Sequence, residues 1–429
     1  MAHREDNPKR KRIVILGGGF AGAYCAQKLD KLLCDEVDVV LMDRNNYMIF
    51  YPLLVEAGTG GVQAKHALVS LRNFVPRSEF IQAEFTGIDT DAQTVDYQII
   101  GEDRTLTMSY DHLVVALGTT TLTPPVPGLA EHAYEMQSLA HAMGLRDRAI
   151  RLLEQANAID DVDRRKRLLH WVVVGGSFTG IEVAGEFHQY LQNASDNYPN
   201  VSRDDIRVTV VNRGDRLLKA LSPELSAYTL RHLTRRGLRI MLNEELAEIH
   251  ADHSICKNSG ERLDAHTVVW CAGIQANPIA ERFGLPTKRG YILCERDLKV
   301  EGFDNVWGLG DGAVNPGPDG DAYPTTAQAA LGMGVDCAKN IARVLRAQPT
   351  EPCNLTDKGK LASFGYGDAV ASAFGVDFKG WLAWFMWRGV YLMKMPGLSR
   401  KLRIAADWTL DLFTRRDYVE MGFYKLLKR

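Results

Sequence analysis

Short apolar runs alternate with helix-like stretches along this chain, and two of the runs end in glycine-rich loops. Residues 13–16 read Ile-Val-Ile-Leu and lead into Gly-Gly-Gly-Phe-Ala-Gly at 17–22. Residues 172–174 read Val-Val-Val and lead into Gly-Gly-Ser-Phe-Thr-Gly at 175–180. Apolar β-branched runs of this length, bounded by glycine, are typical of buried parallel strands. The pattern predicts two strand–loop–helix units of the dinucleotide-binding kind.

The glycines of the first loop have distinct physical roles. Gly17 allows the tight turn out of the strand, Gly19 lets the backbone approach a pyrophosphate, and Gly22 lets the new helix pack closely on the sheet. The helix N-terminus then offers free N–H groups to the phosphates. The next predicted strand, 37–42, ends at Asp43, where a carboxylate accepts hydrogen bonds from the hydroxyls of an adenosine ribose. A dinucleotide site is predicted at this loop.

Two later apolar runs extend the same pattern. Residues 110–118 read as a strand that ends in Gly118, and residues 306–312 read as a short strand that leads into Asp311. At the carboxyl end of a strand, Asp311 is either a turn residue or a ligand for a ribityl or phosphate group. The residues alone leave both interpretations open.

The second loop departs from the usual pattern at two positions. Ser177 stands where the backbone comes closest to the pyrophosphate, and it adds only a small side chain with a hydroxyl donor. The strand at 208–211 ends in Asn212, where NADH sites usually carry Asp or Glu. Arg213 and Arg216 follow and are either ligands for the 2′-phosphate of NADPH or solvated surface charges.

Composition and cysteine spacing narrow the class of protein. At 429 residues the chain has room for two or three domains, and its net charge of −2 argues against a nucleic-acid partner. The seven cysteines include no Cys-x-x-Cys pair, which argues against a zinc site or a disulfide framework. No cysteine lies between 35 and 255, so the redox-active cysteine pair of disulfide reductases is missing. Residues 1–11 are polar and basic and are predicted to be a disordered tail.

The C-terminal region has a composition of its own. From residue 378 to 429 there are 11 Lys or Arg against 4 Asp or Glu, a net charge of +7 that leaves −9 on the preceding residues. Four tryptophans, at 381, 384, 387 and 408, lie in the same region. The apolar run before Arg388 is too short to span a bilayer, which needs about 20 residues. Aromatic and basic side chains in this combination favour a helix in the membrane interface, through residues 378–416. The alternative is that the aromatics pack on the rest of the chain or across a dimer.

With this tail the chain resembles the type II NADH:quinone oxidoreductases, single-chain flavoproteins of respiratory membranes. The most specific segments are Asp43–Leu54 with Ala57–Gly60, Phe178–Glu182, Thr325–Ala330 and Trp381–Gly397. The resemblance implies an α/β fold with two Rossmann-like dinucleotide-binding domains and a C-terminal amphipathic helical membrane-binding segment. It implies an FAD-binding domain at 12–125 and 287–365, an NAD(P)H-binding domain at 126–286, and membrane association at 366–429.

The same resemblance implies the reaction, its site and its location. Hydride passes from NADH to FAD, and two electrons go on to a membrane quinone without proton pumping, at the cytoplasmic face of the cell membrane. FAD is expected at Gly17, Gly18, Gly19, Phe20, Ala21, Gly22, Asp43, Arg44, Phe85 (through its backbone), Gly118, Asp311, Ala327, Gln328 and Lys394. NADH is expected at Gly175, Gly176, Ser177, Gly180, Glu182, Asn212 and Gly273. Glu182 and Gln328 are the expected catalytic residues, and no metal is expected.

Glu182 also has a physical argument of its own. It follows the second phosphate loop, and we expect it on the first turn of the helix, where the helix dipole favours a carboxylate. There it either orients the nicotinamide carboxamide or passes a proton toward a reduced quinone, or it is a first-turn glutamate without a catalytic role.

One departure concerns the acceptor. After Ala330 the family usually continues with a glutamine and a polar or acidic residue near the quinone pocket, whereas this chain has Gly332 and Met333. Two other functions share both loops: a soluble NAD(P)H-dependent reductase that passes electrons to an iron-sulfur protein, and a noncatalytic flavoprotein attached to the membrane. The aromatic tail also permits a homodimer.

Overall fold

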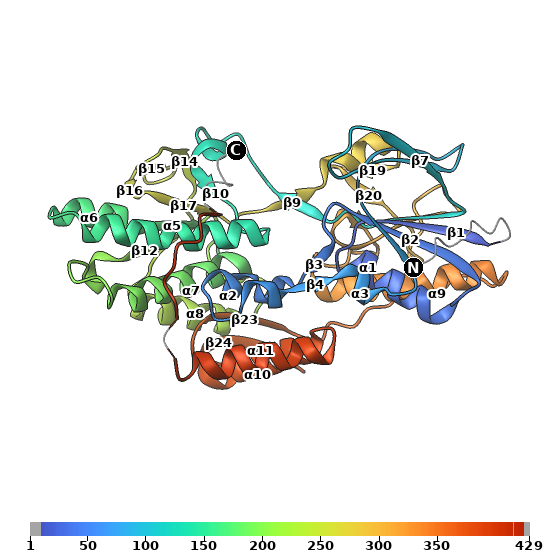
Figure 1. Ribbon diagram of the computed structural model, residues 1–429. Coiled ribbons are helices and arrows are strands. Elements are labelled where there is room, and N and C mark those ends of the chain that lie inside the picture. Colours follow the sequence, from blue (N-terminus) through green and yellow to red (C-terminus); the bar gives the residue numbers. More distant parts are fainter. Residues whose placement is uncertain (1–9, 415, 424–429) are drawn as a thin grey trace. The chain divides into compact units, whose positions relative to one another are not determined.

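The apolar runs that precede the two glycine loops form inner strands of two separate sheets, each paired in parallel with both neighbours (Figure 1). The computed structural model describes residues 10–414 and 416–423, and internal contacts divide the chain into two units. Unit 1 contains the described residues of Met1–Ile49, Leu68–Thr120 and Ile274–Asp357. Unit 2 contains Phe50–Ala67, Thr121–Gly273 and the described residues of Lys358–Arg429.

Unit 1 is built on a seven-stranded sheet in the order β21-β8-β1-β2-β5-β6-β7. The first five strands in this order are parallel, and β6 and β7 continue the sheet in antiparallel pairing. The strands are β21 (Val306–Gly308), β8 (His112–Val115), β1 (Lys11–Leu16), β2 (Val37–Asp43), β5 (Glu79–Asp89), β6 (Thr94–Ile99) and β7 (Thr105–Ser109). The predicted strands at 13–16, 37–42 and 306–308 therefore lie in one sheet.

Two long helices of unit 1, α1 (Phe20–Leu32) and α9 (Ala327–Leu345), pack directly on one another. Their approach depends on Gly334, because a Cβ atom there would lie 2.2 Å from the carbonyl oxygen of Ala21. The smaller elements of this unit are β3 (Tyr47–Ile49), β4 (Leu68–Ser70), α3 (Leu71–Phe74), β18 (Ile274–Ala276), β19 (Thr287–Lys288), β20 (Tyr291–Leu293) and β22 (Ala313–Val314). Strand β9 (Thr119–Thr121), at the boundary between the units, pairs with β18.

Unit 2 is built on a five-stranded parallel sheet in the order β10-β17-β11-β12-β13. These strands are β10 (Ala133–Tyr134), β17 (Thr267–Trp270), β11 (His170–Val174), β12 (Arg207–Asn212) and β13 (Arg239–Leu242). Two antiparallel sheets accompany it: β14 (Leu246–Ile249), β15 (His253–Cys256) and β16 (Arg262–Asp264), and β23 (Lys360–Gly365), β24 (Asp368–Ala373) and β25 (Val376–Lys379). The helices are α2 (Leu54–Gly58), α4 (Leu129–His132), α5 (Leu139–Asn157), α6 (Val162–Leu168), α7 (Phe178–Ser195), α8 (Pro223–Arg235), α10 (Gly380–Lys394) and α11 (Leu398–Asp411).

Residues 139–168 contain two successive helices, α5 and α6. Helix α5 begins after Ser138, whose hydroxyl accepts the backbone N–H of His141, and it ends at Asn157. Asp161 then starts α6 by accepting the N–H groups of Asp163 and Arg164. The N-cap carboxylate of Asp161 stabilises the start of this second helix.

Phe50–Ala67 belongs to unit 2, although this segment lies inside the predicted domain at 12–125. The reason is that α2, within this segment, packs on α5 and α7. The C-terminal region likewise packs into unit 2, through contacts of α10 with β24 and of α7 with β23. The domain boundaries at 125, 286 and 365 concern nucleotide binding and stay predictions.

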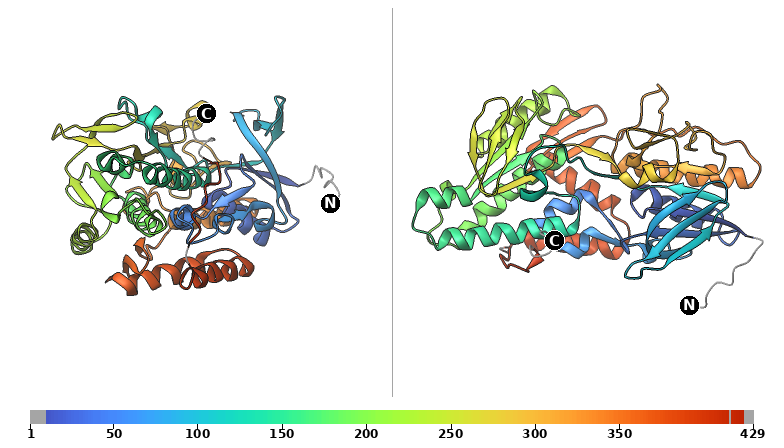
Figure 2. Two further views of the ribbon diagram at one scale, coloured as in Figure 1. Left: turned by 60° about the vertical axis from the view of Figure 1, so that its left-hand side comes forward. Right: turned by 90° about the horizontal axis from the view of Figure 1, so that it is seen from above.

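Helices α10 and α11 lie side by side (Figure 1; Figure 2, left). They are separated by Met395-Pro396-Gly397, in which Gly397 has a positive φ of 83°. Within the described ranges, we find no helix with the length and apolar character needed to cross a bilayer.

Three of the four C-terminal tryptophans are buried in unit 2. Trp384 and Trp387 are each 3% exposed and Trp408 is 5% exposed, whereas Trp381 is 65% exposed. The expectation that the aromatic side chains of this region face the membrane interface is therefore wrong for these three tryptophans. The exposed apolar side chains of the two helices are instead Trp381, Leu382, Phe385, Met393, Leu398, Leu402 and Leu410.

Candidate functional site

The first glycine loop, in unit 1, has the geometry that a bound pyrophosphate requires. Gly17 has a φ of 104°, and a Cβ atom there would lie 2.2 Å from the carbonyl oxygen of Ala116. A Cβ atom on Gly22 would lie 1.9 Å from the carbonyl oxygen of Gly17. No atom lies within 4 Å of a Cβ built on Gly19, so the backbone at the start of α1 is open to approach. The three positions thus match the turn, the helix packing and the close approach predicted for them.

Asp43 holds this loop in place. Its carboxylate accepts the N–H of Gly18 at 2.7 Å and the N–H of Asn45 at 2.7 Å. Burial raises the pKa of Asp43, while the two backbone donors and the nearby Arg44 lower it. Each carboxylate oxygen keeps a second lone pair, so the side chain remains able to accept a hydrogen bond from a ribose hydroxyl.

Asp311 lies against the same region. It belongs to the short 3₁₀ turn Gly310–Gly312 that follows β21. A Cβ atom on Gly310 would be 3.0 Å from Cβ of Ala21, and one on Gly312 would be 2.7 Å from the carbonyl oxygen of Gly118. The structure therefore brings Ala21, Gly118 and Asp311 together beside the first loop. Burial raises the pKa of Asp311 to about 6.

The other residues expected at the flavin lie on several elements. Phe20 is the first residue of α1, and Phe85 is on β5 beside a register shift. Arg44 is exposed, and its carbonyl oxygen accepts a hydrogen bond from Gln82. Ala327 and Gln328 begin α9, and Gln328 donates to the carbonyl oxygen of Thr356 at 3.1 Å. Lys394 is the last residue of α10 and belongs to unit 2.

The second loop, in unit 2, repeats the first in its essentials. Gly175 has a φ of 114°, and a Cβ atom on Gly180 would lie 1.9 Å from the carbonyl oxygen of Gly175. Ser177 occupies the helix N-cap with φ −81° and ψ −177°, close to φ −72° and ψ −168° for Gly19. Because any residue can adopt this extended conformation, serine is accommodated there without strain.

Asn212 takes the place that Asp43 has in unit 1. Its Oδ1 atom accepts the N–H of Gly176 at 3.0 Å, and its Nδ2 group donates to the carbonyl oxygens of Gly214 and Arg216. Arg213 is exposed, and Gly273 is exposed with a φ of 81°. The amide thus ties the loop after β12 to the phosphate loop and offers no carboxylate to a ribose.

Glu182 lies one turn further along α7 than expected. The helix begins at Phe178, and its first turn contains no acidic residue. The helix-dipole argument for Glu182 is therefore wrong, because that effect is confined to the first turn. Its side chain is partly exposed and accepts the N–H of Ser363 at 3.3 Å. The pKa of Glu182 is raised to about 8. Burial is the main cause and the nearby Glu186 and Glu56 add to it, while the hydrogen bond from Ser363 lowers the pKa.

Two further acidic residues of this site were missed in the sequence. Glu56 and Glu186 are each 6% exposed, and burial raises the pKa of Glu56 to about 7 and also raises that of Glu186. The signals were available: Glu56 interrupts the apolar run Leu-Leu-Val-Glu-Ala, and Glu186 follows Glu182 at helical spacing. Arg388, 8% exposed, donates to Oε1 of Glu56 at 3.3 Å, and its guanidinium lies 3.8 Å from the ring centre of Trp384.

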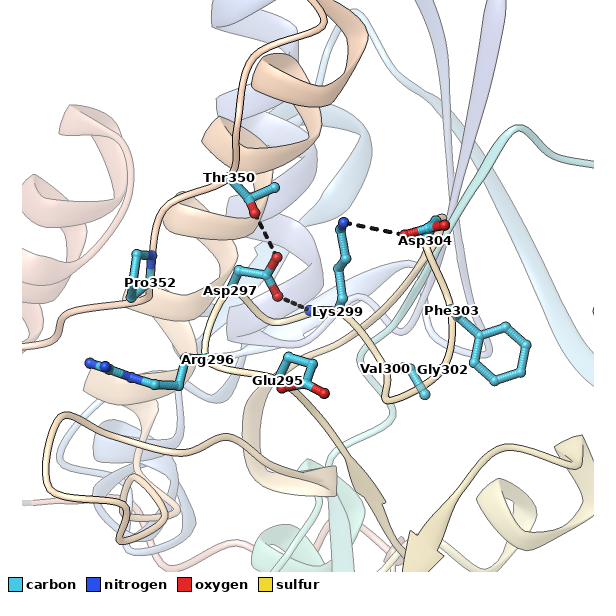
Figure 3. Close-up of a pocket in the computed structure, with 10 residues that line it drawn as sticks. All are labelled: Glu295, Arg296, Asp297, Lys299, Val300, Gly302, Phe303, Asp304, Thr350 and Pro352. Atoms are coloured by element: carbon cyan, nitrogen blue, oxygen red, sulfur yellow. Dashed lines mark hydrogen bonds and ion pairs between the residues drawn. The ribbon is translucent and has the colours of Figure 1, made fainter.

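Unit 1 also contains a pocket of about 500 Å³, and Figure 3 shows the residues that line it. Three of its charged residues, Asp297, Lys299 and Asp304, contact their neighbours. Asp297 accepts the hydroxyl of Thr350 at 2.7 Å and the N–H of Lys299 at 3.2 Å, and Nζ of Lys299 lies 3.7 Å from Asp304. None of the predicted site residues lines it. In the described residues no cluster of side chains suits a metal ion, and all seven cysteines are free.

Two sheets, each with a glycine loop after an inner parallel strand, define a protein with two dinucleotide-binding folds. The family model described as pyridine nucleotide-disulphide oxidoreductase matches residues 11–334, and the one described as NDH2 C-terminal domain matches 358–417. The type II NADH:quinone oxidoreductase of Staphylococcus saprophyticus is 30% identical over 385 residues, covering 88% of this chain and 93% of the relative. The enzyme of that name from Staphylococcus aureus matches to the same extent. The chain belongs to the type II NADH:quinone oxidoreductase family.

Solved structures agree on the fold. NDH2 from Plasmodium falciparum in complex with NADH has a TM-score of 0.88 at 19% identity, covering 96% of this chain and 100% of that one. The sulfide:quinone oxidoreductase of Aquifex aeolicus has a TM-score of 0.70 at 18% identity, covering 95% and 96%. The predicted family and the predicted α/β fold class are confirmed.

Proposed function

We propose that the chain oxidises NADH and reduces a membrane quinone with FAD as its flavin. The observation that carries this proposal is the repeated loop geometry: Gly17 with Gly22 in unit 1, and Gly175 with Gly180 in unit 2, form the same tight turn and close helix approach. Two such loops in one chain suit two dinucleotides. A flavin held there would supply the two-electron chemistry between NADH and the acceptor.

The residues of unit 1 fit FAD rather than a flavin without the adenosine part. The open backbone at Gly19 suits a pyrophosphate, and Asp43 lies at the strand end where an adenosine ribose binds. Asp311 offers a carboxylate to the ribityl and pyrophosphate region. Gly118 leaves room beside it, since a Cβ atom there would meet nothing within 4 Å.

In unit 2 the second loop binds the pyrophosphate of NADH, and Glu182 serves the reaction. With its pKa near 8, Glu182 is largely protonated at neutral pH, so it is suited to donate a proton to the reduced acceptor. Its hydrogen bond from the N–H of Ser363 fixes the direction of the carboxyl group. Glu182 is the residue that we assign as general acid, and Gln328 is assigned to the acceptor side in unit 1.

We assign the exposed apolar side chains of α10 and α11 to the bilayer surface at the cytoplasmic face. Leu398 and Leu402 are 73% and 63% exposed, and Arg403 and Lys394 are exposed beside them. Apolar side chains flanked by basic ones suit anionic lipid. A second copy of the chain is the alternative occupant of this face.

The first experiment is anaerobic oxidation of NADH by the purified flavoprotein, with and without a soluble quinone analogue. We expect NADH to bleach the flavin absorbance and the quinone to restore it over repeated turnovers. Bleaching without reoxidation by quinone would point to another acceptor, and failure to bleach would point to a noncatalytic flavoprotein. Extraction and mass determination of the flavin identify it as FAD or as a shorter flavin.

The membrane assignment is tested with vesicles that contain anionic lipid. The variant Trp381→Gln/Leu398→Gln/Leu402→Gln should lose most of its vesicle association, because it removes apolar area that is not packed in the protein. Val162→Gln is the matched control, since Val162 is 44% exposed on α6. If the triple variant still sediments with vesicles but becomes monomeric, the face is a homodimer interface.

A further inference from the structure

A methionine sulfur holds the turn that carries Asp311 in unit 1. Gly310 begins this turn, is buried, and has a φ of 70°. The first N–H groups of a helical turn have no carbonyl partner within it. The N–H of Gly310 instead donates to Sδ of Met333, on α9, at 3.3 Å. The start of the turn is therefore bonded to α9 through a side chain.

A second donor reaches the same sulfur. Nδ2 of Asn315 lies 3.5 Å from Sδ of Met333, and the two residues are 1% and 3% exposed. Gly310 and Asn315 lie on either side of Asp311 in the sequence, so the sulfur is bonded to both ends of the segment that presents the carboxylate. A thioether is a weak acceptor, but buried donors need a partner, so the two bonds matter more here than they would in water.

Other contacts fix the turn on the side of the sheet. Leu309 donates its N–H to the carbonyl oxygen of Val115 on β8 at 3.0 Å. Ala313, directly after the turn, pairs with Ile292 of β20. The backbone around Asp311 is thus attached to two strands, and Met333 attaches it to α9.

The thioether suits this place because it accepts hydrogen bonds without carrying a charge. A carboxylate at position 333 would bring a second negative charge to the turn of Asp311, which is itself partly buried. A leucine would fill nearly the same volume but would leave both buried donors without their acceptor.

We propose that Met333 is a positioning residue for the flavin. By holding Gly310 and Asn315, its sulfur keeps the Asp311 carboxylate in the direction in which it accepts hydrogen bonds from the ribityl hydroxyls of FAD. This inference rests on the proposed role of Asp311 at the flavin. Met333 acts on the flavin through Asp311, so its effect requires that carboxylate.

The test is the release of flavin from the holoenzyme, measured as the rise of flavin fluorescence after dilution. M333L nearly keeps the volume of the side chain but removes the acceptor, and we expect it to speed release by about tenfold. M333Q returns an uncharged acceptor and should bring the rate back to within about threefold of the wild type. M143L changes a buried methionine of α5 in unit 2 and is the matched control, with release at the wild-type rate.

A double-mutant cycle separates positioning from a general loss of structure. D311A alone should speed release, and adding M333L to D311A should change the rate by less than about twofold, because the carboxylate that Met333 positions is gone. If the two effects multiply in D311A/M333L, or if M333Q releases flavin as fast as M333L, the inference is wrong. N315A removes one of the two donors and gives the same test if M333L does not fold. It should speed release by a smaller factor, and only while Asp311 is present.

Failure of the proposed role of Asp311 gives a different result. If D311A releases flavin at the wild-type rate, Asp311 does not bind the flavin, and the role of Met333 fails with it. If D311A speeds release while M333L matches M143L, only the positioning by Met333 fails. Both results are independent of NADH and quinone, since release is measured without turnover.

Discussion

The indole Nε1–H of Trp408 donates to both carboxylate oxygens of Glu56, at 3.0 Å each. This contact joins α11 to α2 across 352 residues of sequence. Arg388 bonds to the same carboxylate and lies 4.9 Å from the ring centre of Trp408. An aromatic residue that by composition suits the membrane interface is instead a hydrogen-bond donor in the interior of unit 2.

Trp408→Phe should lower the free energy of unfolding by about 1.5–3 kcal/mol, because it removes a hydrogen bond to a charged, buried group. Thermal unfolding of the holoenzyme measures the change. Trp381→Phe is the matched control on α10 and should change stability by less than about 0.5 kcal/mol, since this side chain is 65% exposed. Equal effects of the two substitutions would contradict the burial of Trp408.

Leu355 takes the space of a side chain at position 332. A Cβ atom on Gly332 would lie 2.5 Å from Cδ2 of Leu355. We predict that Gly332→Gln/Leu355→Ala lowers the KM for a quinone analogue by about threefold to tenfold, because one hydrogen-bonding side chain is regained. Gly332→Gln alone should not lower the KM, because Leu355 obstructs the new side chain. Steady-state kinetics give the KM of each variant for the quinone analogue. Equal KM values would mean that position 332 does not contribute to binding of the acceptor.

Asn212 and Arg213 should decide the choice between NADH and NADPH. Arg213→Ala should lower kcat/KM for NADPH by at least about tenfold with little change for NADH, because a charge-assisted hydrogen bond to the 2′-phosphate is lost. Asn212→Asp should act in the same direction by repelling that phosphate. Arg207→Ala, at the opposite end of β12, is the control. If Arg213→Ala and the control have the same kcat/KM for NADPH, Arg213 is a solvated surface charge that does not contact the nucleotide.

We predict that Asp311 is needed to retain the flavin. In the flavin-free protein, its ionisation should lower the free energy of unfolding as pH rises through 6. Its pKa in the folded chain, about 6, lies above the ordinary 3.8 because of burial. The stability linked to its protonated form is complete below pH 3.8 and is lost as pH rises through 6. Asp311→Asn should therefore raise the free energy of unfolding of the flavin-free protein at pH 8 by about 3 kcal/mol.

The same substitution should reduce the flavin bound per chain after purification. Asp304→Asn is the matched control, because the Asp304 side chain is fully exposed. Full flavin content together with unchanged stability at pH 8 would make Asp311 a turn residue only.

Local rules in the sequence were sufficient for both phosphate loops. Gly22 and Gly180 occupy positions where a Cβ atom would meet the backbone of Gly17 and Gly175 of the same loop, and Gly17 and Gly175 have a positive φ. The strands before the loops were also predictable, because runs of buried β-branched residues differ from any helix pattern of their length. Glu182 was placed one turn wrong, since the helix start depends on where the loop ends.

The burial of Glu56 and Glu186 could not be derived in the same way. Glu56, Glu186, Arg388 and Trp408 come together only because α2, α7, α10 and α11 pack in one unit. The hydropathy of a residue can be read from the sequence, but its burial depends on which other elements pack against it.

The sequence by itself thus determined the family, the two nucleotide loops and the basic, aromatic character of the C-terminal region. The tertiary structure alone decided which tryptophans face solvent and which carboxyl groups are buried. The physical reason is that backbone turns are set by neighbours in sequence, while desolvation and charge pairing are set by neighbours in space.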